Sequence, residues 1–184
     1  AQVRAEPFGL DRLEVLKGPA SVMYGQNAPG GIINYVRKKP TTTPINEVQG
    51  QVGNYNRFQG AFDLGGALDE QNEFLYRITG LARSSGTQVD FVRDDRLFIA
   101  PAFTWRPSAQ TSVTVLASYQ KDFSGNSPLP AQGSLMFNPN GRLPTNTNLG
   151  YSNYDGFLRE QFVVGYDFEH RFDDVWSVRQ KVNY

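Results

Sequence analysis

The 184-residue sequence has no cysteine, a single histidine and no net charge, and each absence removes a class of protein. Without cysteine there can be no disulfide framework, thiolate zinc site or cysteine nucleophile. The 18 Lys and Arg residues are balanced by 18 Asp and Glu residues. Binding to nucleic acid needs a clustered positive excess, so we expect no nucleic-acid partner.

Long apolar runs are also missing, and none approaches the roughly 18 residues of a membrane-spanning helix. A helical membrane protein is therefore excluded, whereas a β-barrel is not, because barrel strands cross a bilayer with alternating apolar and polar residues. The first residues do not resemble a signal peptide, and residues 175–184 read as a strand without a closing turn. We expect either an internal segment of a longer protein or a matured, truncated product.

The glycine-rich first segment differs in character from the rest of the chain. Alternation predicts a strand over residues 12–16 and a second strand over residues 32–36. Between them, Pro19 suits the first position of a short helix that Gly25 would end. The sequence thus predicts a small unit of strand, helical turn and strand.

Long alternating segments without a helical period follow from Glu47 onward. They predict about seven strands of roughly 9 to 14 residues, longer than most globular strands and long enough to cross a bilayer. Two of these segments are residues 97–105 and 112–120. One face of these strands carries large apolar side chains and the other carries polar ones, which suits a lipid-facing exterior and a wet interior. Four aromatic residues are expected near strand ends, as in an aromatic girdle: Trp105, Tyr119, Tyr166 and Trp176.

The predicted connections differ in length at the two ends of the strands. Short turns are expected at residues 68–72, 106–110 and 172–174, and long connections at residues 84–94 and 123–157. Short turns at one end and long loops at the other are typical of outer-membrane barrels. A soluble sandwich has no reason to alternate in this way.

Candidate catalytic and metal-binding groups are few. The spacing of Gly18 and Gly25 does not fit a phosphate-binding loop, and His170 has no companion ligands, so a lumen or rim position is expected for it. The acid pairs at residues 94–95 and 173–174 lie in predicted turns, and there is no Gly-x-Ser-x-Gly elbow. We therefore expect no catalytic residue, no enzymatic activity and no metal site.

Two consecutive motifs carry a family resemblance. LEVLKGPASVMYG at residues 13–25 and PGGIINYVRKKP at residues 29–40 closely resemble the end of the plug domain of TonB-dependent outer-membrane receptors, most nearly the ferrichrome-type receptors of hydroxamate siderophores. Further matches lie at residues 81–84, 99–107, 140–145 and 178–180. The plug motif positions are Gly18, Pro19, Tyr24, Gly25, Gly30 and Gly31.

The resemblance implies an all-β-dominated fold in two parts. Residues 1–44 would be the C-terminal part of an α+β plug domain. Residues 45–184 would be the first strands of an antiparallel transmembrane β-barrel, with a long extracellular loop at about residues 123–157. In this family the complete barrel has about 22 strands.

The resemblance also implies a function, namely uptake of a ferric siderophore across the outer membrane of a Gram-negative bacterium. The implied partners are the siderophore, outer-membrane lipid and TonB, which acts through a box upstream of Ala1, and the full receptor would be monomeric. Iron would arrive inside its chelator. We therefore expect no cofactor held by protein side chains.

Site residues follow from the same resemblance. Lys17 would anchor the plug in the lumen, with partner carboxylates beyond Tyr184. Candidate contacts to the ligand come from the long loop, since such loops carry function on a rigid scaffold: Phe123, Asn126, Leu129, Phe137 and Asn138. Ferrichrome-type receptors have an aromatic cluster in this loop, whereas residues 124–130 here contain no aromatic residue.

Three alternatives remain open at this point. The receptor could serve another large nutrient, such as haem, cobalamin or a different chelate, although haem would favour paired histidines and only His170 is present. The chain could instead be a soluble β-rich ligand-binding module. An outer-membrane hydrolase is disfavoured, because the sequence has no nucleophile constellation.

Overall fold

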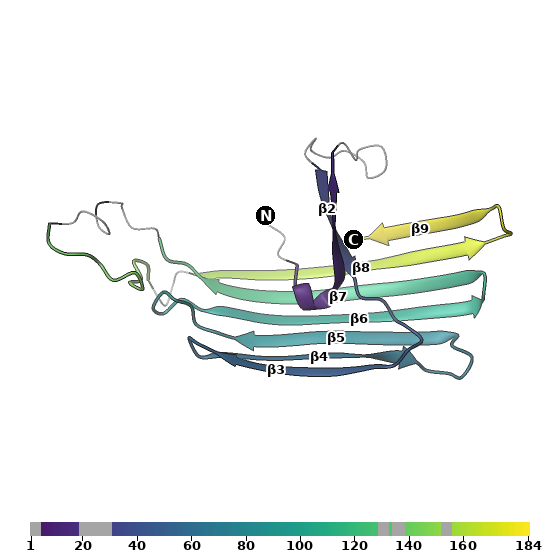
Figure 1. Ribbon diagram of the computed structural model, residues 1–184, viewed down its shortest axis with the longest axis horizontal. Coiled ribbons are helices and arrows are strands. Elements are labelled where there is room, and N and C mark those ends of the chain that lie inside the picture. The colour runs from purple at the N-terminus through teal and green to yellow at the C-terminus, as the bar shows by residue number, and fades with distance from the viewer. Residues whose placement is uncertain (1–4, 19–30, 129–132, 134–138, 152–155) are drawn as a thin grey trace.

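The computed structural model describes residues 5–18, 31–128, 133, 139–151 and 156–184. A two-stranded sheet comes first in the chain and a seven-stranded sheet follows, and both are antiparallel. The small sheet stands against one face of the large sheet, which curves around it (Figure 1). The predicted antiparallel, all-β architecture is confirmed.

The small sheet is built from the glycine-rich first segment. A single 3-10 turn precedes the two strands: η1 (Pro7–Gly9), β1 (Leu10–Lys17) and β2 (Gly31–Arg37). The carboxylate of Glu6 caps η1 by accepting a hydrogen bond from the backbone N–H of Phe8 at 3.0 Å. The two predicted strands are confirmed, while the helical turn predicted between Pro19 and Gly25 lies outside the described residues.

The large sheet contains seven consecutive strands, each paired with its neighbour in the chain. They are β3 (Ile45–Gly53), β4 (Arg57–Ala67), β5 (Phe74–Ser84), β6 (Asp94–Ser108), β7 (Thr111–Gly125), β8 (Gly156–Arg171) and β9 (Ser177–Asn183). The predicted number of strands in this region is confirmed. Their lengths vary more than predicted, from 7 residues in β9 to 16 in β8.

The connections confirm the predicted asymmetry with one exception. Residues 68–73, 109–110 and 172–176 form short turns at one end, and residues 85–93 and 126–155 form longer connections at the other. The exception is the hairpin between β3 and β4, where residues 54–56 make a tight turn at the long-loop end. Tyr55 and Asn56 adopt φ angles of 62° and 53° there, a left-handed geometry that lets the chain reverse within three residues.

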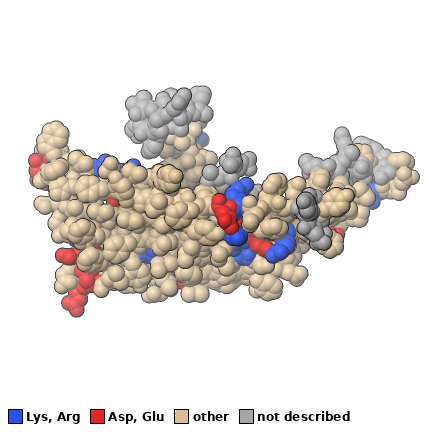
Figure 2. All heavy atoms as spheres, turned by 180° about the vertical axis from the view of Figure 1, so that it is seen from behind, with Lys and Arg blue, Asp and Glu red and all other residues tan. Residues whose placement is uncertain are grey.

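The convex face of the large sheet is apolar and exposed. The register aligns outward side chains in rows, such as Phe74, Trp105, Val113 and Phe168 on four successive strands. Large side chains on this face remain accessible, including Val48, Phe58, Leu97, Ile99, Phe103 and Phe162. Figure 2 shows this face as a broad area with few charged residues. A continuous exposed apolar surface of this size marks an interaction surface.

The four aromatic residues predicted near strand ends do not all lie there. Trp105 lies three residues before the end of β6, and Trp176 lies in the short turn before β9. Tyr166 lies two residues before Phe168 on β8, opposite Val115, and is therefore further from the short-turn end. Tyr119 is placed differently, because it pairs with Ile99 and Phe162 near the middle of the sheet. The prediction was therefore wrong for Tyr119, whose strand extends six residues further to Gly125.

The short turn between β4 and β5 depends on one carboxylate. Asp69 accepts hydrogen bonds from the backbone N–H groups of Phe74 at 2.7 Å and Glu73 at 2.9 Å. These bonds, that of Phe74 first, favour the ionised form and hold the pKa of Asp69 below its usual range. The turn is therefore stabilised above the unfolded-state pKa of about 3.9, and this stabilisation is lost as the pH falls through the lower pKa of the folded state.

We expect Asp69→Ala to weaken this turn at neutral pH but not in acid. Amide exchange of Glu73 and Phe74, measured by NMR and corrected for intrinsic rates, should be faster in the variant at neutral pH. The difference from the wild type should disappear once Asp69 is protonated in the wild type. A difference that stays constant through the acid range would show that the carboxylate charge does not stabilise the turn.

Candidate functional site

The concave face of the large sheet carries polar and charged side chains, and the small sheet lies against it (Figure 1). These side chains come from the inward positions of the alternating strands, such as Asp63, Arg77 and Asp122. Two ionic clusters and one apolar patch join the first segment to this face. These contacts join segments that are distant in the sequence, and we take this interface as the candidate site.

The first cluster is centred on Asp63 of β4, whose side chain is only 1% exposed. Its carboxylate receives two hydrogen bonds from Arg77 of β5, from Nε at 2.9 Å and from Nη2 at 2.8 Å. Lys38, which follows β2, donates from Nζ at 2.7 Å, and Thr79 donates from Oγ1 at 3.2 Å. We call the large sheet, β3 to β9, the wall, and residues 5–44 the first segment. One buried carboxylate is thus shared by two cations, one from the wall and one from the first segment.

Neighbouring contacts extend this attachment along the linker to β3. Arg77 also donates from Nη1 to the carbonyl oxygen of Lys39 at 3.0 Å. The side chain of Lys39 forms an ion pair with Asp167 on β8. Successive residues of an extended chain point in opposite directions, so Lys38 and Lys39 reach different parts of the wall. The linker is therefore fixed from two sides.

The second cluster lies near the beginning of the described chain. Glu6 pairs with Arg96 of β6, whose Nη1 lies 2.6 Å from the carboxylate, and the exposed fractions of the two side chains are 6% and 8%. Arg96 also donates from Nε to Asp122 of β7. Gln120 completes the group with a hydrogen bond of 2.7 Å to Asp122. This cluster attaches η1 to the wall.

An apolar patch lies beside the Glu6 cluster. Ala61, Leu81 and Phe98 form the core on three neighbouring strands, and Phe8 packs against it. Gly9 approaches the wall so closely that an added Cβ would lie 2.3 Å from the ring of Phe98. Only glycine leaves room for this contact. Burial of the patch supplies a hydrophobic contribution alongside the two ionic clusters.

The sequence-predicted residues lie mainly elsewhere. Lys17 is exposed at the end of β1 and forms no ion pair with any described residue. Phe123 lies within β7, opposite Leu158 and near the guanidinium of Arg93, and Asn126 begins the connection to β8. Gly18 and Gly31 have positive φ angles of 94° and 122°. The remaining predicted residues lie outside the described part: Pro19, Tyr24, Gly25, Gly30, Leu129, Phe137 and Asn138.

His170 occupies a rim position, one of the two positions expected for it. It lies near the short-turn end of β8, where its Nδ1 and the hydroxyl of Thr111 are 2.8 Å apart. Its ring also meets that of Phe172 edge-on at 4.4 Å. Within the described residues, no group of three or more His, Cys, Asp or Glu side chains could hold a metal ion. No described helix is long and apolar enough to cross a membrane.

The two ionic clusters were missed by the sequence reasoning, although a signal was present. Asp63, Arg77 and Asp122 are charged residues at inward positions of alternating strands. A charge there must find a partner when the lumen is filled. The partners Lys38 and Glu6 could not be found from spacing, because contact between distant segments depends on how the first segment sits in the curved sheet.

Comparison with known proteins connects this arrangement to a family. A model described as the TonB-dependent Receptor Plug Domain matches residues 3–32. The ferrichrome outer membrane transporter/phage receptor of Escherichia coli K12 is 42% identical over 97% of this chain. The ferrioxamine receptor of Yersinia enterocolitica is 39% identical over 99% of it. The chain corresponds to a segment of TonB-dependent siderophore receptors.

Two solved receptor structures have the same fold over this segment. The pyoverdine receptor FpvA of Pseudomonas aeruginosa PAO1 superposes with a TM-score of 0.85, at 22% identity over 97% of this chain and 26% of its own length. The ferric-catecholate receptor Fiu of E. coli K12 gives 0.83, at 19% identity over 96% of this chain and 28% of its own. The present chain spans about a quarter of the length of its curated relatives, 24% and 25% for the two named above.

Proposed function

We propose that the chain is part of an outer-membrane receptor that imports a ferric hydroxamate siderophore with energy supplied through TonB. The observation that carries the proposal is the similarity to ferrichrome and ferrioxamine receptors along nearly the whole chain. In this proposal residues 1–44 belong to the plug and residues 45–184 to the barrel wall. The apolar convex face would contact outer-membrane lipid.

The interface supports a transport role. Glu6, Lys38 and Lys39 attach the first segment to the wall through ion pairs, which can break and form again without covalent chemistry. The bound chelate would carry the iron, so the protein need not supply metal ligands. The named relatives are transporters and receptors, and we propose no catalytic residue for this chain.

The ligand would be captured at the long-loop end of the strands. We propose that the connection between β7 and β8 contributes contacts, from Asn126 and from the predicted loop residues Leu129, Phe137 and Asn138. Phe123 would support the base of this loop from β7. Lys17 would add a further plug anchor outside the described contacts.

Iron uptake by the full-length receptor tests this function. In a Gram-negative strain without other hydroxamate receptors, the receptor should import radioactive iron as ferrichrome or ferrioxamine, but only when TonB is present. Uptake of a ferric catecholate alone would overturn the hydroxamate assignment. TonB-independent uptake would overturn the proposed mechanism.

The same assay includes a loop variant. Residues 126–155 can be replaced by a short turn, because β7 and β8 remain paired up to Gly125 and Gly156. Uptake should fall sharply while the amount of receptor in the outer membrane stays constant. Unchanged uptake would show that this loop does not capture the ligand.

A further inference from the structure

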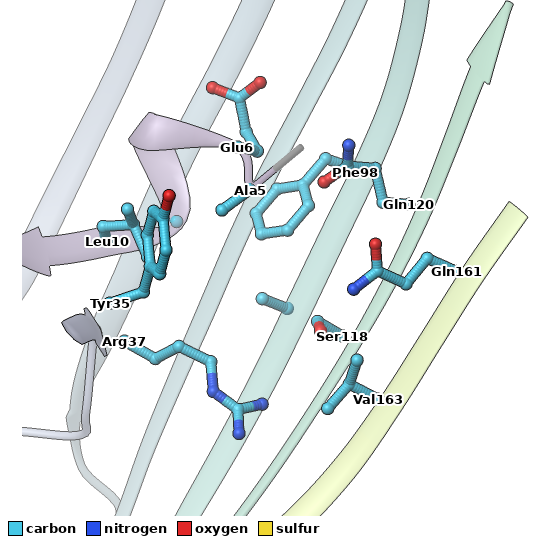
Figure 3. A pocket seen from close by; sticks show the side chains of 12 residues that line it. Ala5, Glu6, Leu10, Tyr35, Arg37, Phe98, Ser118, Gln120, Gln161 and Val163 are labelled. Atoms are coloured by element: carbon cyan, nitrogen blue, oxygen red, sulfur yellow. The ribbon is translucent and has the colours of Figure 1, made fainter. Parts of the chain in front are cut away.

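A cavity lies between the small sheet and the wall, separate from the predicted loop site. It has a volume of about 200 Å³ and is lined by residues of η1, β1 and β2 on one side and of β6, β7 and β8 on the other. Figure 3 shows Arg37 reaching from β2 toward Ser118 and Gln161 on the wall. The lining also contains the apolar side chains of Phe98 and Val163.

Arg37 has unused hydrogen-bonding capacity in this cavity. Its Nη2 donates to the side-chain oxygen of Asn183 on β9. Its Nη1 is buried and has no hydrogen-bond partner in the described part of the protein. Burying a donor without a partner is unfavourable, and more so when the donor is charged. Such a group is expected where a ligand completes the contact.

Two further polar side chains face the same space. Among the described residues, the hydroxyl of Ser118 and the amide of Gln161 form no side-chain hydrogen bond. The acidic lining residue, Glu6, is already paired with Arg96. The cavity therefore offers hydrogen-bond donors and a positive charge without a free carboxylate to compete. A mainly apolar pocket with a few convergent polar groups is the usual form of a ligand site.

We propose that this cavity is a lumenal contact site for the ferric chelate during its passage, with Arg37 as the principal donor. The inference rests on the proposed function. Hydroxamate groups present oxygen acceptors, which Arg37, Ser118 and Gln161 can bind together. The volume is below the roughly 300–1,000 Å³ that encloses a whole drug-sized ligand. The cavity therefore holds one arm of the chelate as it moves between the plug and the wall.

Transport kinetics of the full-length receptor test this site. Arg37→Met should lower the maximal rate of ferric hydroxamate uptake roughly tenfold, while chelate binding to chilled cells keeps its Kd, because capture occurs at the loops. Arg37→Lys should recover part of the rate, since it restores a cationic donor. Gln161→Met, on the wall, should lower the rate by a smaller factor. Arg12→Met is the matched control, because Arg12 lies on the same hairpin but is exposed and outside the cavity.

The outcomes separate the site from the function. If the wild type and Arg37→Met take up the chelate at the same rate, the cavity assignment is wrong and the proposed function still stands. If the Kd of Arg37→Met for the chelate rises in proportion to its loss of uptake rate, Arg37 acts in initial capture. This result would also overturn the cavity assignment. If inorganic phosphate slows wild-type uptake but not uptake by Arg37→Met, a free anion occupies the cavity and the chelate assignment is wrong. Absence of hydroxamate uptake by the wild type would overturn the proposed function itself.

Discussion

Replacing Asp63 with asparagine should release the linker between β2 and β3 from the barrel wall. The substitution removes the negative charge that Arg77 and Lys38 share, and leaves two cations close together in a site that is 1% exposed at its centre. Removing one partner of a buried ion pair costs about 3–5 kcal/mol, because the remaining charge is left uncompensated. We expect a loss of local stability in this range for residues 38–44.

Hydrogen exchange with mass spectrometry on the refolded full-length receptor measures this effect, because it reports local opening free energies. Peptides that contain Lys38, whose backbone N–H donates to the carbonyl oxygen of Gly9 at 3.2 Å, should lose protection in Asp63→Asn. The control is Glu160→Gln, which breaks the pair with Lys121 on the same wall, where the two side chains are 50% and 45% exposed. Such an exposed pair contributes about 0–1 kcal/mol. Equal, small effects of both variants would show that the Asp63 cluster does not fix the linker.

Replacing Arg96 with methionine should release the other end of the first segment. Arg96 neutralises both Glu6 and Asp122, and its side chain is 8% exposed. Without it, the two buried carboxylates lie close together with no cation between them. The expected loss is again about 3–5 kcal/mol, centred on η1 and the beginning of β1.

The two variants act as controls for each other. Arg96→Met should raise exchange mainly in peptides around residues 6–10, and Asp63→Asn mainly at Lys38. The two clusters share no residue, but Lys38 also contacts η1, because its backbone N–H donates to the carbonyl oxygen of Gly9 at 3.2 Å and its ammonium lies 4.3 Å from the ring centroid of Phe8. A smaller effect is therefore expected at the other end. Equal loss of protection in both regions from either substitution would show that the first segment detaches from the wall as one cooperative unit.

The two attachments differ in composition, which bears on how the interface could open. At Asp63 one acid holds two bases, and at Arg96 one base holds two acids. The Glu6 contact also depends on the close approach of Gly9 to Phe98, whereas the Lys38 contact is reinforced by Lys39 and Asp167. Motion of the first segment would therefore break different contacts at its two ends.

Much of the large sheet could be predicted, because alternation is a local property. Residues 97–105 and 112–120 were assigned to strands from their side chains alone, and they lie within β6 and β7. Strand ends were harder to place. β7 continues to Gly125, beyond the predicted strand, because Phe123 and Ser124 still pair with Leu158 and Phe157. Such pairing depends on a neighbour more than thirty residues away, which no local pattern reveals.

The candidate site was predicted less well, for a related reason. The expected anchor, Lys17, is exposed, and the observed attachments use Glu6 and Lys38. In the sequence, Lys38 is part of the motif at residues 29–40, and nothing there distinguishes it. Its role arises because the linker passes within 2.7 Å of Asp63, whose own position follows from the register of β4 with β5.

The sequence alone determined that the chain is all-β and favoured a membrane-type sheet over a soluble one. Strands that alternate over about ten residues predict a sheet with one apolar face, since side-chain period and strand length are local quantities. Tertiary structure alone decided which charges meet inside the sheet. Curvature brings Glu6 to Arg96 and Lys38 to Asp63 across 90 and 25 residues of chain, and it leaves Arg37 facing a cavity with an unused donor. A buried charge is stabilised by its neighbours in space, and only the folded chain defines them.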